Sequence, residues 1–287
     1  MALSIVSLCQ AAEAIRHTVE IVIADDGEVS RQFASALQTR FPAAQVIDAK
    51  THKPGSRGTL TFAIGPTALR SLLAQQGESA ILSVGTSREI YRAALADTPN
   101  PSTSVSAIYT EPAPDDQLHL IDLLYTKRVE IAVLLSSSTE YLRPILQQSA
   151  RQKNVTLTIE HVERDDSLNR TLNQVSGAPV LLVMPDFSLF NRENMRTILI
   201  TAYRHNQAVV GFSKTLVKAG ALASVYSNIE DIADQVQEIV NDYDNTNRLP
   251  EPSYPKYFSV AVNDAIARSL NIVVRDEARN FSRKSKK

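Results

Sequence analysis

The sequence predicts an α/β fold made of two doubly wound lobes, each built on a mostly parallel sheet, with three crossings of the chain between them. Three observations lead to this prediction. Short runs of β-branched residues alternate with amphipathic segments along most of the 287 residues. The chain is too long for one small core, and 44% of its residues are hydrophobic, which is enough to fill two. The alternation is also interrupted three times by segments that suit connections rather than core elements.

The first half contains five runs with the composition of buried strands. They are Val19–Ala24, Ala44–Ala49, Leu60–Ile64, Ala80–Val84 and Ser104–Tyr109. Between them lie "VSRQFASALQTRF", "PTALRSLLAQQ" and "REIYRAALA", which have apolar residues at helical spacing. A βαβ series of this kind predicts a parallel sheet.

A second series of the same kind occupies the other half of the chain. Its predicted strands begin near Val129, Val155, Val180 and Ala208, each about one βαβ unit after the last. A final predicted strand, Phe258–Val262, precedes a helix in "NDAIARSL". The second half therefore predicts a second lobe with the same architecture as the first.

The three interruptions divide the chain between the lobes. They lie at Thr110–Asp116, Ser224–Asp231 and the proline-rich Leu249–Pro255. Three crossings permit the lobes to close as a hinge over something held between them. The expected division is a signal-peptide remnant at 1–14, a first lobe at 15–109 and 226–250, a second lobe at 110–225 and 251–275, and a basic tail at 276–287.

The first 14 residues are predicted to be the remnant of a signal peptide. They are apolar and end in Ala12-Glu13-Ala14, a small-x-small pattern that signal peptidase accepts. The basic residues that normally open a signal peptide are missing, so an amphipathic helix packed on the body is the alternative. A lipid anchor on Cys9 is disfavoured because the bulky Leu8 precedes it. Export of a chain whose one cysteine is Cys9 fits a periplasmic location.

The overall charge excludes several classes of partner. With 30 basic and 31 acidic residues and a formal net charge of -1, the chain lacks the positive field of a nucleic-acid-binding protein. Beyond the apolar N-terminal stretch, no run approaches the roughly 20 apolar residues that span a bilayer. The basic end of the chain, residues 276–287, is expected to be a solvated, frayed tail. We therefore predict no nucleic-acid partner and no membrane span.

Polar and aromatic residues follow the predicted strands, at the edge where ligands bind in open parallel sheets. Such residues can donate hydrogen bonds to a polar ligand while rings cover its apolar part. Because Ser, Thr and Asp also cap helices and Gly makes tight turns, a capping role is the alternative for each residue taken singly. The candidate ligand-binding residues are Asp26, Gly65, Pro66, Thr67, Thr86, Ser137, Ser138, Thr139, Tyr141, Asp186, Phe187 and Ser213.

Two phenylalanines stand beside a turn in "VLLVMPDFSLF", where water would reach them. We expect this loop to face the other lobe, with Phe187 and Phe190 shielded there by closure and by ligand. The alternative is that an aromatic ring folds back onto its own lobe, and this applies more to Phe190 because a helix follows it.

The sequence lacks the motifs of common enzymes and metal sites. The run "IVIADDGEVSRQFASAL" is similar to the start of a response-regulator receiver domain, but the third predicted strand ends in Ile64-Gly65-Pro66, without the required aspartate. The fifth predicted strand has no lysine, so a metal role for Asp25 and Asp26 is disfavoured. The histidines are scattered, and no Walker, G-x-G-x-x-G or G-x-S-x-G pattern is present. We predict a protein that is not an enzyme and that has no cofactor or metal.

The second half resembles a known family. The run "APVLLVMPDFSLFNRENMRTILITAYRHNQAVVGFSKTLVKAGALASVYSNIEDIADQVQEIV", followed by "KYFSVAVNDAIARSLNI", is similar to ABC-transporter substrate-binding proteins of the group that includes tryptophan and tyrosine binders. The match is good over 179–273 and looser over "FAIGPTAL" and Glu130–Gln152. The resemblance implies a periplasmic-binding-protein type I pair of lobes.

The resemblance also implies positions for the ligand loops. By position they fall on Gly65-Pro66-Thr67 in the first lobe and on Ser137-Ser138-Thr139, Asp186 and Ser213 in the second. The chain departs from the family in two places. It has "SSSTEY" where the family has an Asn-Pro turn with an acidic residue and Asn, and "GTSREI" where the family has an Asp-Asp-Pro-Val stretch. The family's usual ligand therefore cannot be assumed.

The function that follows is solute binding in the periplasm. We expect two lobes that close over a small polar or aromatic-bearing ligand, such as an amino acid, and deliver it to an inner-membrane ABC permease. The alternative is an exported sensor or accessory interaction protein on the same fold, without solute delivery.

Overall fold

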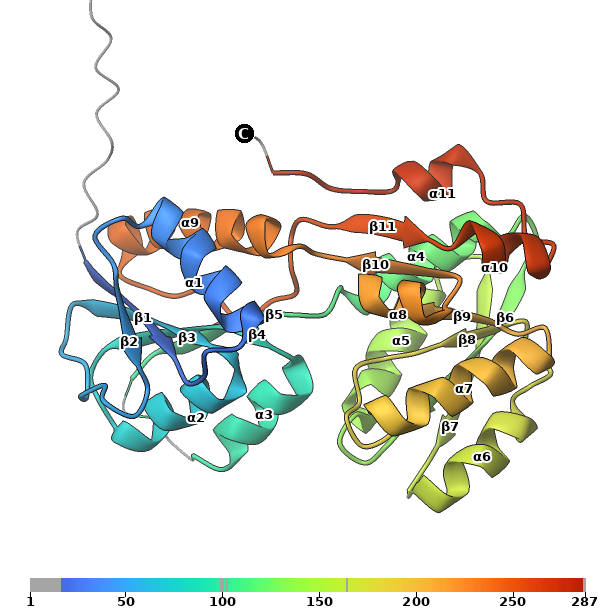
Figure 1. The fold of residues 1–287 in the computed structure, drawn as a ribbon, viewed down its shortest axis with the longest axis horizontal. Coiled ribbons are helices and arrows are strands. Elements are labelled where there is room, and N and C mark those ends of the chain that lie inside the picture. The colour runs from blue at the N-terminus through green and yellow to red at the C-terminus, as the bar shows by residue number, and fades with distance from the viewer. Residues whose placement is uncertain (1–16, 99–100, 102, 164, 286–287) are drawn as a thin grey trace, which may run out of the picture.

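The chain forms two α/β lobes that lie side by side and are joined by three segments (Figure 1). The computed structural model describes residues 17–98, 101, 103–163 and 165–285. The predicted fold class is confirmed, because each lobe has its own sheet with helices on both faces. The predicted signal peptide and Cys9 lie outside the described residues.

The first lobe is built on a five-stranded parallel sheet in the order β2-β1-β3-β4-β5. Its strands are β1 (Thr18–Ile23), β2 (Gln45–Asp48), β3 (Thr59–Ile64), β4 (Ala80–Thr86) and β5 (Val105–Tyr109). Its helices are α1 (Glu28–Arg40), α2 (Gly65–Gln75), α3 (Arg88–Ala96) and α9 (Ile229–Thr246). All six residues of β3 are buried, as expected for a central strand covered on both faces. Residues of α1 and α9, such as Phe33, Leu37 and Val236, cover one face, and α2 and α3 cover the other.

The second lobe has a six-stranded sheet in the order β11-β10-β9-β8-β6-β7. Its strands are β6 (Val129–Leu135), β7 (Val155–His161), β8 (Val180–Leu182), β9 (Ala208–Gly211), β10 (Ala223–Tyr226) and β11 (Ser259–Val262). Its helices are α4 (Pro114–Leu124), the 3-10 turn η1 (Glu140–Leu142), α5 (Arg143–Ala150), α6 (Asp165–Gln174), α7 (Arg192–Arg204), α8 (Lys214–Ala219), α10 (Asp264–Ser269) and α11 (Asp276–Asn280). The strands are parallel except β11, which runs antiparallel to β10. Residues of α4 and α5 pack on one face, and those of α6 and α7 pack on the other.

Two of the predicted connections are shorter in the structure than in the prediction. Within Thr110–Asp116, Pro114 already begins α4, because proline suits the first turn of a helix and Asp115 adds favourable charge there. Within Ser224–Asp231, the first residues belong to β10, and the next helix begins with a capping box between Asn228 and Asp231. The polar composition that predicted breaks therefore marks helix starts as well.

The three crossings run along one side of the molecule and contact one another (Figure 1). They join β5 to α4, β10 to α9, and α9 to β11. Ser253 in the third crossing pairs beside β5, since Tyr109 N donates to Ser253 O over 2.9 Å and Ser253 N donates to Ala107 O over 2.9 Å. The Ser227 hydroxyl in the second crossing donates to Tyr257 O over 2.6 Å. The crossings thus form one connected hinge region rather than three separate links.

The described part of the basic tail is packed, so the prediction of a frayed end is wrong for residues 276–285. The Phe281 ring centroid lies 4.9 Å from that of Phe258, which is buried, and 4.8 Å from that of His119. Backbone hydrogen bonds join Phe258 and Arg283 in both directions. The Ser285 hydroxyl then reaches Asp234 on α9, at 2.6 Å. Charge alone suggested a solvated end, but Phe281 supplies an apolar anchor.

The anchor makes a stability prediction. Phe281→Ala removes the ring that packs on Phe258, so we expect the free energy of unfolding to fall by about 2 kcal/mol, less than for a fully buried Phe because Phe281 is partly exposed. Urea denaturation measures this change. Ser282→Ala, at an exposed neighbouring position, is the matched control and should have no effect. Equal midpoints for the two variants would show that the tail is not docked.

Candidate functional site

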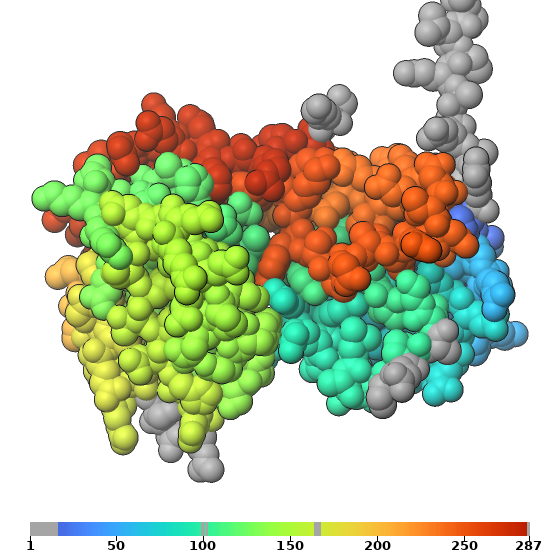
Figure 2. Space-filling view, turned by 180° about the vertical axis from the view of Figure 1, so that it is seen from behind, coloured from blue at the N-terminus to red at the C-terminus, as the bar shows by residue number. Residues whose placement is uncertain are grey.

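Turns from the two lobes meet at Glu89, in the first turn of α3. The Ser138 hydroxyl, on the loop after β6, donates to Glu89 Oε1 over 2.7 Å. The backbone N–H of Phe187, on the loop after β8, donates to Glu89 Oε2 over 3.3 Å. In the space-filling view the lobes abut beneath the connecting segments (Figure 2). Glu89 therefore receives two hydrogen bonds from the second lobe, and burial raises its pKa above the usual range.

Arg88, the residue before, lies among tyrosines from three parts of the molecule. Its guanidinium carbon is 5.9 Å from the ring centroid of Tyr109, 5.2 Å from Tyr141 and 5.4 Å from Tyr254. Its Nη1 donates to the Tyr254 hydroxyl over 2.8 Å. One turn later, the Arg92 guanidinium lies 4.5 Å from the centroid of Tyr141. Tyr109 belongs to the first lobe, Tyr141 to the second and Tyr254 to the third crossing, so these cation–π contacts link all three.

The tyrosines remain neutral at physiological pH. Burial raises the pKa of Tyr254 to about 12 and raises that of Tyr141 further. They therefore present uncharged ring faces to Arg88, and Tyr141 does so to Arg92 as well.

Glu111 is a buried carboxyl in the first crossing, 5% exposed. Its Oε1 accepts from the backbone N–H of Arg88 over 2.8 Å, and its Oε2 accepts from the Thr110 hydroxyl over 3.3 Å. Burial disfavours the charged form and raises the pKa of Glu111 to about 7, although these hydrogen bonds oppose the shift. The hinge thus carries a carboxyl that titrates near neutral pH.

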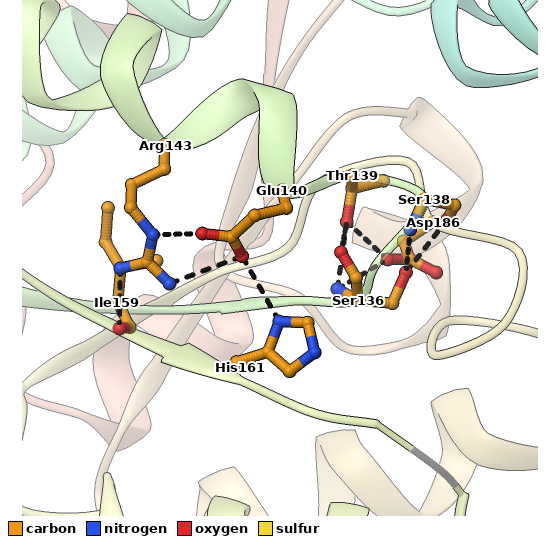
Figure 3. Close-up of polar contacts among 8 residues, drawn as sticks. All are labelled: Ser136, Ser138, Thr139, Glu140, Arg143, Ile159, His161 and Asp186. Atoms are coloured by element: carbon orange, nitrogen blue, oxygen red, sulfur yellow. Dashed lines mark hydrogen bonds and ion pairs between the residues drawn. The ribbon is translucent and has the colours of Figure 1, made fainter.

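Asp186 joins the two loops of the second lobe that reach Glu89 (Figure 3). Its Oδ2 accepts from Ser136 N and the Thr139 hydroxyl on the loop after β6. Its Oδ1 accepts from the N–H and hydroxyl of Ser188 and from Leu189 N on its own loop. Burial alone would raise the pKa of Asp186, but these donors hold it below the usual range. The carboxylate therefore fixes the relative position of the two loops.

A second polar cluster holds the 3-10 turn that carries Tyr141 (Figure 3). Glu140 accepts from Arg143 Nε and lies 3.2 Å from His161 Nδ1, while Arg143 Nη1 donates to the Ile159 carbonyl over 3.1 Å. The hydrogen bond from Arg143 lowers the pKa of Glu140. Strand β7 is thereby tied to the turn on which Tyr141 faces α3.

The structure brings together half of the predicted site residues. Those at or beside the contact between the lobes are Thr86, Ser138, Thr139, Tyr141, Asp186 and Phe187. The other predicted residues are Asp26, Gly65, Pro66, Thr67, Ser137 and Ser213, and within the described part of the chain no hydrogen bond, ion pair or ring contact joins them across the lobes.

Several of these residues have local roles. Ser213 caps α8 by accepting from Leu216 N over 3.3 Å. Asp26 is exposed, and its carbonyl accepts from Arg31. Gly65 has φ of 79° and begins α2, and its N lies 3.5 Å from the position of a Cβ on Gly85, so the carboxyl ends of β3 and β4 are neighbours.

The two phenylalanines beside the turn behave differently. Phe190 is 7% exposed and packs in the core of its own lobe, which was the alternative for this residue. The Phe187 N–H faces the other lobe, as expected, but its ring is 59% exposed rather than shielded. The contact between the lobes therefore leaves one large ring exposed to water.

Sequence reasoning missed the residues that make most of the contact. They are Arg88, Glu89, Arg92, Tyr109, Glu111 and Tyr254. The available signal was position: Arg88 and Glu89 stand a few residues after the predicted strand Ala80–Val84, in "GTSREI", and Glu111 and Tyr254 stand in predicted crossings. In the described ranges, no group of three or more His, Cys, Asp or Glu side chains could hold a metal ion, and no helix is long and apolar enough to cross a membrane.

Solved structures share this arrangement of lobes. A ligand-free, open substrate-binding protein with adhesive properties from Clostridium difficile aligns with TM-score 0.67 and 15% identity, over 94% of this chain and 100% of that one. The ABC domain in complex with L-Trp from Streptococcus pneumonia aligns with TM-score 0.61 and 12% identity, over 93% and 99%. The chain has the type I periplasmic-binding-protein fold.

A periplasmic ribose ABC transporter from Conexibacter woesei extends the likeness, with TM-score 0.50 and 12% identity, over 93% of this chain and 98% of that one. No family model and no curated protein matches the sequence. At these sequence identities the likeness concerns the fold only. The side chains at the contact between the lobes are therefore interpreted from this chain's own structure.

The raised pKa of Glu111 predicts how the stability of the protein depends on pH. Because its folded-state pKa is raised to about 7, ionisation is easier in the unfolded chain, so stability falls as pH rises from about 4.5 to 7 and changes no further above that range. The whole loss is about 3 kcal/mol. We expect Glu111→Gln to abolish this dependence, measured by urea denaturation between pH 4.5 and 8.

The matched control is Glu130→Gln, an exposed glutamate on β6, which should keep the slope. A slope that survives Glu111→Gln unchanged would assign the dependence to other groups.

Asp186 makes a prediction about structure rather than ligand contact. Asp186→Ala leaves buried donors on two loops unpaired, so we expect a loss of about 2 to 4 kcal/mol in the free energy of unfolding. Asp25→Ala, which removes an exposed turn cap after β1, should cost less than about 1 kcal/mol. Equal losses by calorimetry would mean that the Asp186 hydrogen bonds contribute little.

Proposed function

We propose that the chain is the periplasmic solute-binding component of an ABC importer. In this proposal its lobes close over a small polar or aromatic-bearing molecule and deliver it to an inner-membrane permease. The observation that carries the proposal is the convergence at Arg88 and Glu89, where side chains from both lobes meet. A contact of this kind gives a ligand in the gap direct control over lobe closure.

The contacts between the lobes are of a strength that suits a reversible closure. They are a few hydrogen bonds and cation–π contacts, each worth about 1 kcal/mol in net terms. The apolar cores lie within the individual lobes. Opening therefore costs little while each lobe stays folded, and a ligand that contacts both lobes stabilises the closed form by its differential affinity.

The fold neighbours support a solute-binding role over an enzymatic one. One of them is an ABC domain in complex with L-Trp, and another is a periplasmic ribose ABC transporter. Ligands in such two-lobed α/β proteins lie at the carboxyl ends of the strands, where Thr86 ends β4 and where Ser138 and Phe187 follow β6 and β8. Periplasmic location and the permease partner belong to the proposal by the same analogy.

A second candidate is an exported interaction protein on the same fold, without solute delivery. The neighbour from Clostridium difficile is described as having adhesive properties, and the exposed ring of Phe187 is the kind of group that protein partners bury. Thermal melting with a panel of amino acids, sugars and organic acids separates the two, because a tight ligand of the native state raises the melting temperature. Stabilisation by no compound would favour the interaction protein.

Glu89 provides the variant that tests closure. Glu89→Ala removes both hydrogen bonds across the lobes, so we expect a larger radius of gyration without ligand, measured by small-angle X-ray scattering. The affinity for a ligand found in the panel should fall about tenfold, because closure becomes less favourable by about 1.4 kcal/mol. The melting temperature without ligand should change little.

The control is Glu28→Ala, which removes an exposed first-turn glutamate from α1 in the same lobe. It should leave both the radius and the affinity as they were. If Glu89→Ala behaved like this control, the contact would not govern closure and the proposal would lose its main support.

A further inference from the structure

Two arginines at the contact between the lobes lack carboxylate partners. Arg88 and Arg92 lie one turn apart on α3, and among the described residues neither side chain forms an ion pair within 4.0 Å. Other arginines do, such as Arg40 with Asp234. The Nε of Arg88 is buried and has no hydrogen-bond partner in the described chain. A buried N–H of a guanidinium without an acceptor is costly, so a ligand acceptor there would relieve a penalty.

Tyr141 holds the two guanidiniums from the opposite lobe. Its ring centroid lies 5.2 Å from the Arg88 guanidinium carbon and 4.5 Å from that of Arg92. Ring contacts occupy the faces of a guanidinium and leave its N–H edge available for hydrogen bonds. That edge can bind a carboxylate or phosphate in a bidentate manner. Closure of the lobes therefore brings Tyr141 onto the two groups best suited to bind an anion.

The carboxylates at the same contact are already engaged. Glu89 accepts from the second lobe, and Glu111 accepts from Arg88 N and Thr110. Asp186 accepts five hydrogen bonds from its own lobe. An ammonium group would share these carboxylates with donors that they already have and would lie close to two guanidiniums, whereas an anion meets guanidiniums that form no ion pair among the described residues. The site thus favours negative charge on the ligand and offers little to a positive group.

We propose, on the basis of the function proposed above, that the site between the lobes takes an organic anion without an ammonium group, bound at its carboxylate or phosphate by Arg88 and Arg92. The apolar part of this solute lies against Phe187, whose exposed ring stands on the loop that reaches Glu89. The site therefore discriminates against zwitterionic amino acids.

Matched sets of compounds test this inference by isothermal titration calorimetry at pH 7.5. The phenol set is 3-(4-hydroxyphenyl)propanoate, its carboxamide, L-tyrosine and tyramine. The indole set is 3-(indol-3-yl)propanoate, its carboxamide, L-tryptophan and tryptamine. An aliphatic set is butanoate, butanamide, 4-aminobutanoate and butylamine, and phenyl phosphate, ribose and allose complete the panel.

In any set with a compound that binds, we expect the acid to bind at least about tenfold more tightly than the amide or the zwitterion. We expect the amine of that set not to bind. Preference for phenyl phosphate over the acids would identify phosphate as the anionic group. Equal or tighter binding of an amino acid, an amide or a sugar would overturn the inference while the proposed function stands. If no compound binds and Glu89→Ala leaves the radius of gyration unchanged, both this inference and the proposed function are overturned.

Arginine variants locate the anion. Arg92→Gln should lower the affinity for the acid by about tenfold and leave the weak affinity for its amide unchanged. Arg92→Lys should recover part of the lost affinity, because lysine restores the charge but not the planar guanidinium. Arg70→Gln, an exposed arginine on α2 of the same lobe, is the matched control and should change neither. Melting temperatures of all variants confirm folding. An Arg92→Gln protein that weakens acid and amide equally would show that Arg92 contributes packing rather than anion binding.

Discussion

The first turn of α3 contacts the second lobe and two of the three crossings, so it depends on the groups that orient the lobes. Glu89 accepts hydrogen bonds from two loops of the second lobe, and the Arg88 side chain lies against Tyr141 of that lobe. The Arg88 backbone N–H is bound by Glu111 in the first crossing, and its side chain is bound by Tyr254 in the third. A change in any of these groups therefore acts on both the hinge and the closed contact.

The lobes are stable for a different reason than the contact between them. Each is an ordinary layered α/β core, in which strands such as β3 have every residue buried. The contact between the lobes is polar and aromatic and contains Glu111, whose burial is unfavourable when it is charged. Functional sites often carry such locally unfavourable groups, supported by stable cores elsewhere. The separation of the two kinds of interaction lets the lobes move without unfolding.

The fold was accessible from sequence because its signals are repeated. Each βαβ unit brings a β-branched run and an amphipathic helix, so one weak signal is reinforced by its neighbours. The contact between the lobes has no such repetition. Arg88 reads as an ordinary first-turn helix residue, and Tyr254 reads as part of a proline-rich connection. Their meeting depends on how three crossings orient two lobes, which no local pattern encodes. The docked tail was missed for the same reason, since Phe281 finds its partner Phe258 through tertiary packing.

The two stretches in which the sequence departs from the family it resembles are the stretches that meet in the structure. "GTSREI" supplies Arg88 and Glu89, and "SSSTEY" supplies Ser138 and Tyr141. Across the lobes, Ser138 donates to Glu89, and the ring of Tyr141 lies against Arg88. An acidic stretch at the first of these places would suit a ligand with an ammonium group. In this chain Arg88 and Glu89 stand at that place, so one cation lies beside one anion there, and Tyr141 on the other lobe provides a ring face for Arg88. A ligand of different charge requires both sides of this contact to suit a guanidinium, because the half-buried Arg88 would otherwise be desolvated at a cost.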